Sequence, residues 1–534
     1  MTGKNDKLLL SKEHIDSVIA LYSVGKFDEA IEVALQLTKS YPADSLLFNI
    51  TGACYTSLGQ LGSALDYYEK SISINPNYSK AHFNLGNTLY DLAHQGFVHL
   101  EKPIKSYQKS IEIDPNYAEA HNNLGNVLNE LDRTQEAIDS FNKAININPD
   151  YVEAHYSLGM ALFDLGEFKN AIKAYQKAVK INPVFAEAYN NLGNAYLELD
   201  KHNDSVECYQ KAIKINPNYS EAYNNLGNTF KELGKHKDSV ECYQKALEIN
   251  PDYPALHNNL GNAYKELGKL EDALSSYSKG LSINSGYIDL LNNLGVTLSE
   301  LSRLDEAIDA YEKAISINPE YAKAYNNLGV ALNKLGKHEE AVKSYEKALK
   351  VEPEYADAYN NLGVVLKKLG RTNEAIKSYE KALNINQDDA DTHNNLGIAL
   401  DEVGRLDDAI KSYQKAIFIQ PDMAEAYNNY GHILCKLHKY HEAAKSYEKV
   451  LVIKPNLAYV LGNLLNAKMN LCDWNGLDSL LNDAKAQIKN NQKVIEPFNL
   501  MALIDEPKLQ KQAQELRIFS DHPRSSVLPM IKKY

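Results

Sequence analysis

The sequence has little of what marks secreted, membrane-spanning or nucleic-acid-binding proteins. It has five cysteines in 534 residues, and none of them forms a C-x-x-C pair, so a disulfide framework is excluded and a reducing, cytoplasmic location is expected. Lysine and arginine number 57 against 70 aspartates and glutamates, and this lack of basic excess predicts no nucleic-acid partner. No apolar run approaches the ~20 residues of a membrane helix, and the polar start of the chain lacks a secretory signal, so we expect no membrane association.

Motifs for catalysis and cofactor binding are also missing. The sequence contains no P-loop, no G-x-G-x-x-G and no H-E-x-x-H pattern, so we expect no cofactor and identify no catalytic residue. His438 and His441 are three residues apart, but no further ligand motif accompanies them, and we expect no metal site. These absences leave open whether the protein is part of an enzyme whose catalytic residues lie elsewhere.

A repeat of 34 residues fills most of the chain. In the stretch from Ala186 to Tyr219, Asn191-Leu192-Gly193 lies in the first half, Tyr209 and Ala212 lie in the second half, and Pro217 comes near the end. This length and this signature are typical of the tetratricopeptide repeat (TPR), a pair of helices joined by a turn. One glycine marks each repeat at a constant spacing of 34 residues: Gly193, Gly227, Gly261, Gly295, Gly329, Gly363, Gly397 and Gly431.

The signature residues predict how the two helices pack. Leucine, tyrosine and alanine recur at i, i+3 and i+4 spacings, which predicts one buried stripe per helix. Glycine costs ~1 kcal/mol relative to alanine in a helix, so we expect it to allow close packing, with the later alanine as the matching small surface. The tyrosines recur with the repeat, which favours core packing over stacking on a ligand.

These patterns predict an all-α TPR solenoid of about thirteen repeats. We expect an N-terminal tail at 1–10, a TPR array at 11–457 with an insertion near 93–100, and a helical cap at 458–534. Around Gly280 the usual proline step is replaced by Ser-Gly, which is explained either by neutral drift or by a hinge.

Asparagine occupies the sixth place of the repeat, counting Ala186 as the first, and Ser157 interrupts the series. In TPR arrays this place lines the concave groove, and an amide can both donate to and accept from the backbone of an extended peptide. The alternative is that these side chains only tie neighbouring repeats together. The predicted peptide-binding residues are Asn84, Asn123, Asn191, Asn225, Asn259, Asn293, Asn327, Asn361, Asn395 and Asn429.

Two further places predict that the groove changes along the chain. The ninth place is asparagine at Asn87, Asn126, Asn194, Asn228 and Asn262 and is then Val296, Val330, Val364 and Ile398. The thirteenth place is acidic from Asp91 to Glu300 and then becomes Lys334 and Lys368. We therefore expect extended polypeptide partners that are basic or neutral. The acidic, asparagine-rich groove argues against the type of TPR that clamps a terminal carboxylate with lysine and arginine.

The tail resembles one particular family. Cys472-Asp473-Trp474 follows the last repeat, and Glu496-Pro497-Phe498 comes later. These motifs resemble the junction between the TPR array and the catalytic half of protein O-GlcNAc transferases and Spindly-like proteins, in their bacterial branch. The resemblance implies a substrate- and partner-binding arm for a glycosyltransferase that uses a UDP-sugar. That half is absent from this sequence, so no catalytic residue carries over. The alternatives are a free-standing scaffold and a transferase relative that lacks the chemistry.

Overall fold

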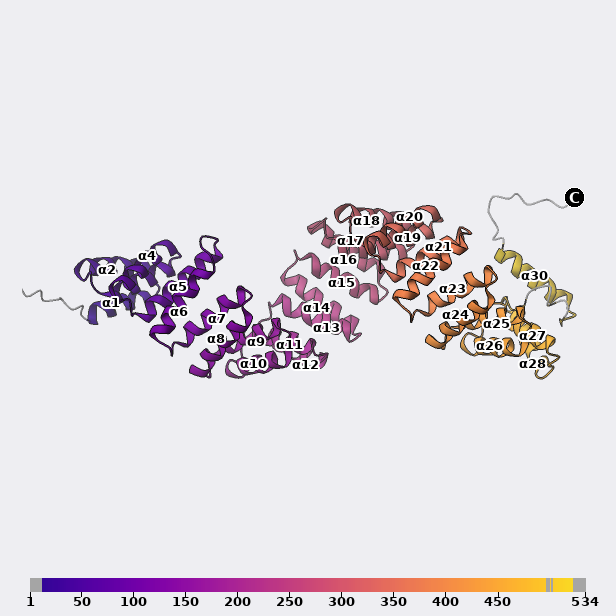
Figure 1. Cartoon of the computed structure of the whole chain (residues 1–534), viewed down its shortest axis with the longest axis horizontal. Helices are drawn as coiled ribbons and strands as arrows, with labels where there is room; N and C mark the ends of the chain where they lie inside the picture. The colour runs from indigo at the N-terminus through magenta and orange to yellow at the C-terminus, as the bar shows by residue number, and fades with distance from the viewer. Residues whose placement is uncertain (1–11, 496–499, 501–502, 522–534) are drawn as a thin grey trace, which may run out of the picture. The chain divides into compact units, whose positions relative to one another are not determined.

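The computed structural model describes residues 12–495, 500 and 503–521. This part of the chain contains 29 α-helices and no strand (Figure 1). The predicted all-α fold is therefore confirmed. None of the described helices combines the length and the apolar character needed to cross a membrane.

Helices α1 to α26 alternate as the first and second helices of thirteen consecutive repeats. The first helices are α1 Lys12–Ser23, α3 Ser45–Ser57, α5 Ser79–His94, α7 Ala118–Glu130, α9 Val152–Asp164, α11 Ala186–Leu197, α13 Ser220–Glu232, α15 Pro254–Glu266, α17 Ile288–Glu300, α19 Ala322–Lys334, α21 Ala356–Lys368, α23 Ala390–Glu402 and α25 Ala424–Lys436. The second helices are α2 Phe27–Ser40, α4 Leu61–Ile74, α6 Glu101–Ile113, α8 Thr134–Ile147, α10 Phe168–Ile181, α12 His202–Ile215, α14 His236–Ile249, α16 Leu270–Ile283, α18 Leu304–Ile317, α20 His338–Val351, α22 Thr372–Ile385, α24 Leu406–Ile419 and α26 Tyr440–Ile453. The remaining described helices are α27 Val460–Asn470, α28 Leu477–Lys489 and α30 Pro507–Asp521.

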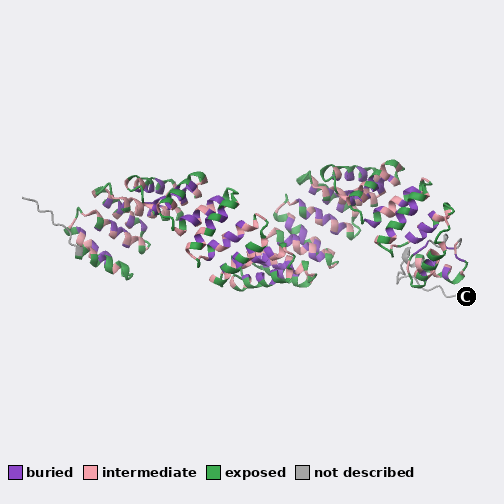
Figure 2. Cartoon of the chain, turned by 90° about the horizontal axis from the view of Figure 1, so that it is seen from below, coloured by how far each residue is buried: buried purple, intermediate pink, exposed green. Residues whose placement is uncertain are grey.

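The chain divides into two compact units, the first ending at Lys269 and the second beginning at Leu270. Within each unit consecutive helices pack together, and a first helix also contacts the first helix of the next repeat, as α19 does with α21. Buried positions therefore follow the inward faces of the helices, while the outer faces are exposed (Figure 2). Contacts limited to near neighbours are the defining property of a solenoid.

First-helix glycines from Gly52 to Gly431 are matched to an aromatic ring on the second helix, which is Phe141 for Gly125 and a tyrosine for most others. A Cβ added to Gly193 would lie 2.6 Å from Cε1 of Tyr209, and the Tyr209 ring is fully buried. The expectation that the alanine is the glycine's counterpart is therefore wrong. The alanine of α18, Ala314, instead clusters with Leu291 and with Ala324 of the following repeat. The flat ring occupies the space that a side chain at the glycine would fill. The alanine instead allows the next repeat to approach closely.

An asparagine turn joins many of the repeats to the next. Asn216 caps the end of α12, and its side-chain oxygen accepts a hydrogen bond from the backbone N–H of Asn218 at 3.1 Å. The same turn forms at Asn284, where the backbone N–H of Gly286 donates at 3.0 Å although the proline is missing. The flanking helices α16 and α17 keep the usual 14 and 13 residues. The asparagine thus forms the turn without the proline, and a hinge near Gly280 stays a hypothesis.

The inserted residues lengthen α5 and the turn after it. Helix α5 has 16 residues and ends at His94, and α6 begins at Glu101 with Pro103 buried in its first turn. The added turn of helix brings His94 Nε2 within 3.3 Å of Glu130 in the next repeat, and the Tyr90 hydroxyl donates to the same carboxylate.

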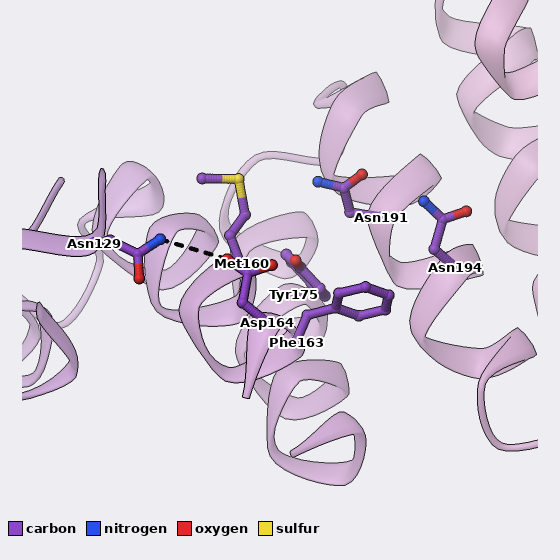
Figure 3. A pocket seen from close by; sticks show the side chains of 7 residues that line it. All are labelled: Asn129, Met160, Phe163, Asp164, Tyr175, Asn191 and Asn194. Atoms are coloured by element: carbon purple, nitrogen blue, oxygen red, sulfur yellow. Dashed lines mark hydrogen bonds between the residues drawn. The ribbon is translucent and has the colours of Figure 1, made fainter. Parts of the chain in front are cut away.

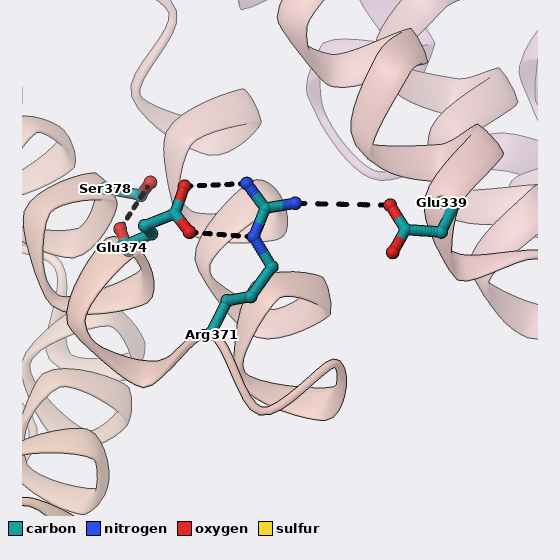
Figure 4. Close-up of polar contacts among 4 residues, drawn as sticks. All are labelled: Glu339, Arg371, Glu374 and Ser378. Atoms are coloured by element: carbon teal, nitrogen blue, oxygen red, sulfur yellow. Dashed lines mark hydrogen bonds and ion pairs between the residues drawn. The ribbon is translucent and has the colours of Figure 1, made fainter.

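The turn between the two helices of a repeat often carries an arginine. Arg371 precedes α22, and its guanidinium donates to Glu374 at 2.6 and 2.8 Å while lying 4.0 Å from Glu339 of the preceding repeat (Figure 4). The Ser378 hydroxyl donates to the backbone oxygen of Glu374 at 3.1 Å. These ion pairs are largely exposed, so they contribute little to stability.

The residues after the last repeat cover its end. The backbone N–H of Tyr459 donates to Lys493 at 2.8 Å, and that of Gly462 donates to Val494 at 3.0 Å. A Cβ on Gly462 would lie 2.9 Å from Cα of Ile495, so this segment lies directly against α27. Glu496-Pro497-Phe498 lies outside the described residues.

Candidate functional site

One face of the first helices collects the places that the sequence singled out. We call it the groove face and define it by the sixth, ninth, twelfth and thirteenth places together with the hydroxyl end of the tyrosine on the second helix. In the first unit it contains a hollow of about 200 Å³ (Figure 3). In the second unit a hollow of about 410 Å³ includes His432, Lys436, Tyr447 and Asn463. The first hollow is lined by Asn129, Met160, Phe163, Asp164, Tyr175, Asn191 and Asn194.

The ten predicted asparagines, which we call the asparagine ladder, are all half-buried residues of the first helices. In seven of them the amide Nδ2 donates to the fifth-place asparagine of the preceding repeat. The donor, acceptor and distance are Asn84 to Asn49 3.0 Å, Asn225 to Asn190 3.2 Å, Asn259 to Asn224 3.0 Å, Asn327 to Asn292 2.9 Å, Asn361 to Asn326 3.1 Å, Asn395 to Asn360 3.1 Å and Asn429 to Asn394 3.0 Å.

Two members of the ladder use other acceptors because their fifth-place neighbour is aromatic. Asn123 donates to Asn87 at 2.9 Å, and Asn191 donates to the Tyr156 hydroxyl at 3.0 Å. Asn293 occupies the equivalent place in α17. The ladder therefore does tie repeats together. The tie uses an amide hydrogen and not the amide oxygen, which can accept two hydrogen bonds.

The fifth and sixth places together form a relay across the repeats. Asn259 donates to Asn224, which donates weakly to Asn225 at 3.3 Å, and Asn225 donates to Asn190. Asn190 in turn lies 3.4 Å from the oxygen of Asn191. Sequence reasoning missed the fifth place, although the Asn-Asn doublet that recurs from Asn190-Asn191 to Asn428-Asn429 was a visible signal for it.

In the first unit, three ninth-place asparagines accept hydrogen bonds from the buried tyrosines Tyr107, Tyr209 and Tyr243. The Tyr209 hydroxyl donates to Asn194 at 2.6 Å, and the Tyr243 hydroxyl donates to Asn228 at 2.7 Å. These hydroxyls therefore end at the groove face, already paired. Valine at this place in the second unit has no acceptor to offer.

The thirteenth-place carboxylates of the first unit face uncharged or titratable partners. Asp164 accepts from the Asn129 amide at 3.5 Å, and Glu232 lies 3.5 Å from His202 Nδ1. The Asn129 amide carries no charge that could offset the Asp164 carboxylate. In the second unit Lys368 donates to the Asn333 amide oxygen at 3.1 Å, and Lys436 pairs with Asp401 at 2.7 Å.

The repeat cysteines are packed as core residues. Burial raises the pKa of Cys208 and of Cys242 to about 12. A thiol with such a pKa stays protonated at neutral pH and is a poor nucleophile.

Comparison with known families identifies the repeat. A model described as "TPR repeat" matches residues 52–92, 125–166, 159–200, 193–234 and 227–268. Models described as "Tetratricopeptide repeat" match residues 106–139, 252–320, 290–354, 320–388, 354–420 and 424–457. The chain therefore belongs to the tetratricopeptide-repeat proteins.

The individual relatives match only part of the chain. A "TPR repeat-containing protein" of Borreliella burgdorferi is 33% identical over 91 residues, which make up 17% of this chain and 34% of that protein. The chain thus spans about a third of that curated relative. The crystal structure of MamA protein is 29% identical, with a TM-score of 0.30, and covers 32% of this chain and 93% of its own. YrrB, described as "a TPR protein with an unusual peptide-binding site", is 24% identical with a TM-score of 0.31, covering 35% of this chain and 96% of its own.

Proposed function

We propose that the groove faces bind extended polypeptide segments, and that those bound by the first unit are basic or neutral. The observation that carries this proposal is the asparagine ladder, a row of ten half-buried amides on the first helices, of which Asn191 lines the hollow of the first unit. Peptide N–H groups occur in every sequence and can donate to such oxygens. A row that repeats along the array suits a long partner better than a small ligand.

Charge supports the partner class in the first unit. Carboxylates stand at the thirteenth place of successive repeats, and the group closest to Asp164 is an uncharged amide. Such a row attracts lysine- and arginine-containing segments, and added salt should weaken that attraction.

The ladder's structural role dictates how the proposal must be tested. A variant with Asn327, Asn361 and Asn395 changed to alanine loses both the ladder amides and their ties to the preceding repeats. The matched control changes the three acceptors Asn292, Asn326 and Asn360 to alanine. It loses the same ties but keeps the ladder side chains.

Both variants would be titrated with a fluorescent neutral peptide library after circular dichroism has shown that they are helical. Each lost contact is worth ~0.5–1.5 kcal/mol, so the ladder variant should bind at least about tenfold more weakly than the control. Equal binding by the two variants would show that the ladder is only structural.

A more specific proposal is that this array is the substrate-binding arm of a protein O-GlcNAc-transferase-like protein. It is supported by Cys472-Asp473-Trp474, whose tryptophan is 60% exposed and whose cysteine is exposed, as expected of a surface that meets a further part of a protein. The alternative is a free-standing scaffold. Sequencing the gene past the codon for Tyr534 and assaying its whole product with UDP-sugars distinguishes them.

The domain limits and the location stay predictions. We propose the array at 11–457 and the cap at 458–534 as the functional division. Limited proteolysis followed by mass spectrometry of the fragments tests it. A cytoplasmic location is proposed on the scarcity of cysteine, and cell fractionation tests it.

A further inference from the structure

Some buried tyrosines of the second unit reach the groove face without a partner, and Tyr345 and Tyr379 are two of them. Their side chains are each 1% exposed, and neither hydroxyl has a hydrogen-bond partner among the described residues. Their rings lie against Gly329 and Gly363, as Tyr209 lies against Gly193. In the first unit the hydroxyls of Tyr209 and Tyr243 instead donate to the ninth-place asparagine of their own repeat.

The ninth place explains why these hydroxyls are unpaired. It holds Val330 in the repeat of Tyr345 and Val364 in the repeat of Tyr379, and both valines pack against the core as partly buried residues. Valine has no acceptor atom, so each hydroxyl keeps a donor hydrogen that nothing in the described structure uses. Tyr447, the equivalent residue two repeats further on, lines a hollow of the groove face.

The charges around these hydroxyls also differ from those of the first unit. Lys334 and Lys368 hold the thirteenth place in the same two repeats, and Lys368 donates to an amide oxygen rather than to a carboxylate. The following thirteenth-place residue, Glu402, is already paired with Lys367 at 2.9 Å. This stretch therefore combines unused hydroxyl donors, two ammonium groups and an apolar ninth place.

We propose that the groove face formed by α19 and α21 binds an acidic polypeptide segment, in which aspartate or glutamate side chains alternate with apolar ones. The carboxylates accept hydrogen bonds from the Tyr345 and Tyr379 hydroxyls and pair with Lys334 and Lys368. The apolar side chains of the segment cover the two ninth-place valines. This inference rests on the proposed function and assigns the two units partners of opposite charge.

The test removes only the hydroxyls. Y345F/Y379F keeps both rings against their glycines, so the repeats should fold as before. The matched control is Y209F/Y243F, whose hydroxyls are paired with asparagine in the first unit. The full chain and its variants would be titrated by fluorescence anisotropy with three labelled peptides of equal length: acidic-apolar, basic and neutral.

Binding of the acidic-apolar peptide should weaken about tenfold in Y345F/Y379F and stay unchanged in Y209F/Y243F. The basic peptide should bind Y345F/Y379F as well as it binds the parent. In a third variant, K334Q/K368Q, the acidic peptide should bind more weakly and lose most of its salt dependence. This variant keeps the test decisive if the tyrosine substitutions disturb the fold.

Two results would overturn the inference by different routes. If the basic and neutral peptides bind and the acidic one does not, or if it binds all variants equally, the inference fails and the proposed function stands. If none of the three peptides binds the parent chain, the proposed function fails with it.

Discussion

Replacing Gly329 with alanine should destabilise its repeat, although alanine is the better helix former. A Cβ at this position would lie 2.6, 2.8 and 2.9 Å from Cε1, Cζ and Cδ1 of Tyr345, whose ring is 1% exposed. Overpacking a core costs ~1–3 kcal/mol, and the gain in helix propensity is ~1 kcal/mol. The net loss should therefore be about 0–2 kcal/mol, centred near 1 kcal/mol.

Hydrogen exchange measured within α19 and α20 is the appropriate assay, because a long repeat array does not unfold in two states. A loss of ~1 kcal/mol corresponds to about fivefold faster exchange. The matched control is Gly62→Ala in α4, where an added Cβ meets no heavy atom within 4 Å. That change should slow exchange in its own helix, because only the propensity gain remains.

A double substitution isolates the ring as the cause. In a Tyr345→Leu background the ring is gone, so Gly329→Ala should cost less than it does in the parent or should stabilise. If Gly329→Ala stabilises the parent as much as Gly62→Ala does, the ring yields easily and the packing argument is refuted.

Three other predictions concern charge. Burial lowers the pKa of His121 and of His432. The unfolded chain therefore binds protons more readily than the folded one, and the thermal midpoint should fall as the pH drops below about 6.5. Replacing both histidines with asparagine should reduce that pH dependence. Burial raises the pKa of Tyr68 and of Tyr311 to about 12, so stability should be lost as the pH rises past about 10, the ordinary tyrosine value; ultraviolet difference absorbance and circular dichroism should then show tyrosine ionisation and unfolding together. Arg371→Gln removes only exposed ion pairs and should leave the thermal midpoint unchanged within error; a clear drop would show that the turn depends on them.

The helical architecture could be predicted because it depends on spacing along the chain. The 34-residue period, the apolar stripes and the asparagine turns are local features that repeat in register. The pairing of Gly193 with Tyr209 could not be read from that period. Which residue of the second helix fills the space above the glycine depends on the angle between the helices.

The site could be predicted less well, because its contacts cross from one repeat to the next. The sixth place was identified from its regular asparagines. The hydrogen-bond acceptor of a sixth-place asparagine lies 35 residues earlier in the chain, at the fifth place of the preceding repeat, as Asn292 does for Asn327. The missing partners of Tyr345 and Tyr379 likewise follow from valine at the ninth place, where the sequence indicated only an apolar surface.

The amide relay gives the groove face a direction. From Asn259 back to Asn190, each bond between repeats runs from a later repeat to an earlier one, so the amide dipoles add instead of cancelling. The donating N–H groups are turned toward the start of the chain, and each amide oxygen that accepts one bond in the relay can accept a second from a partner. A bound backbone must then align its own N–H groups with that row. A peptide laid in one orientation along the face therefore differs in energy from the same peptide reversed, even where its side chains touch nothing.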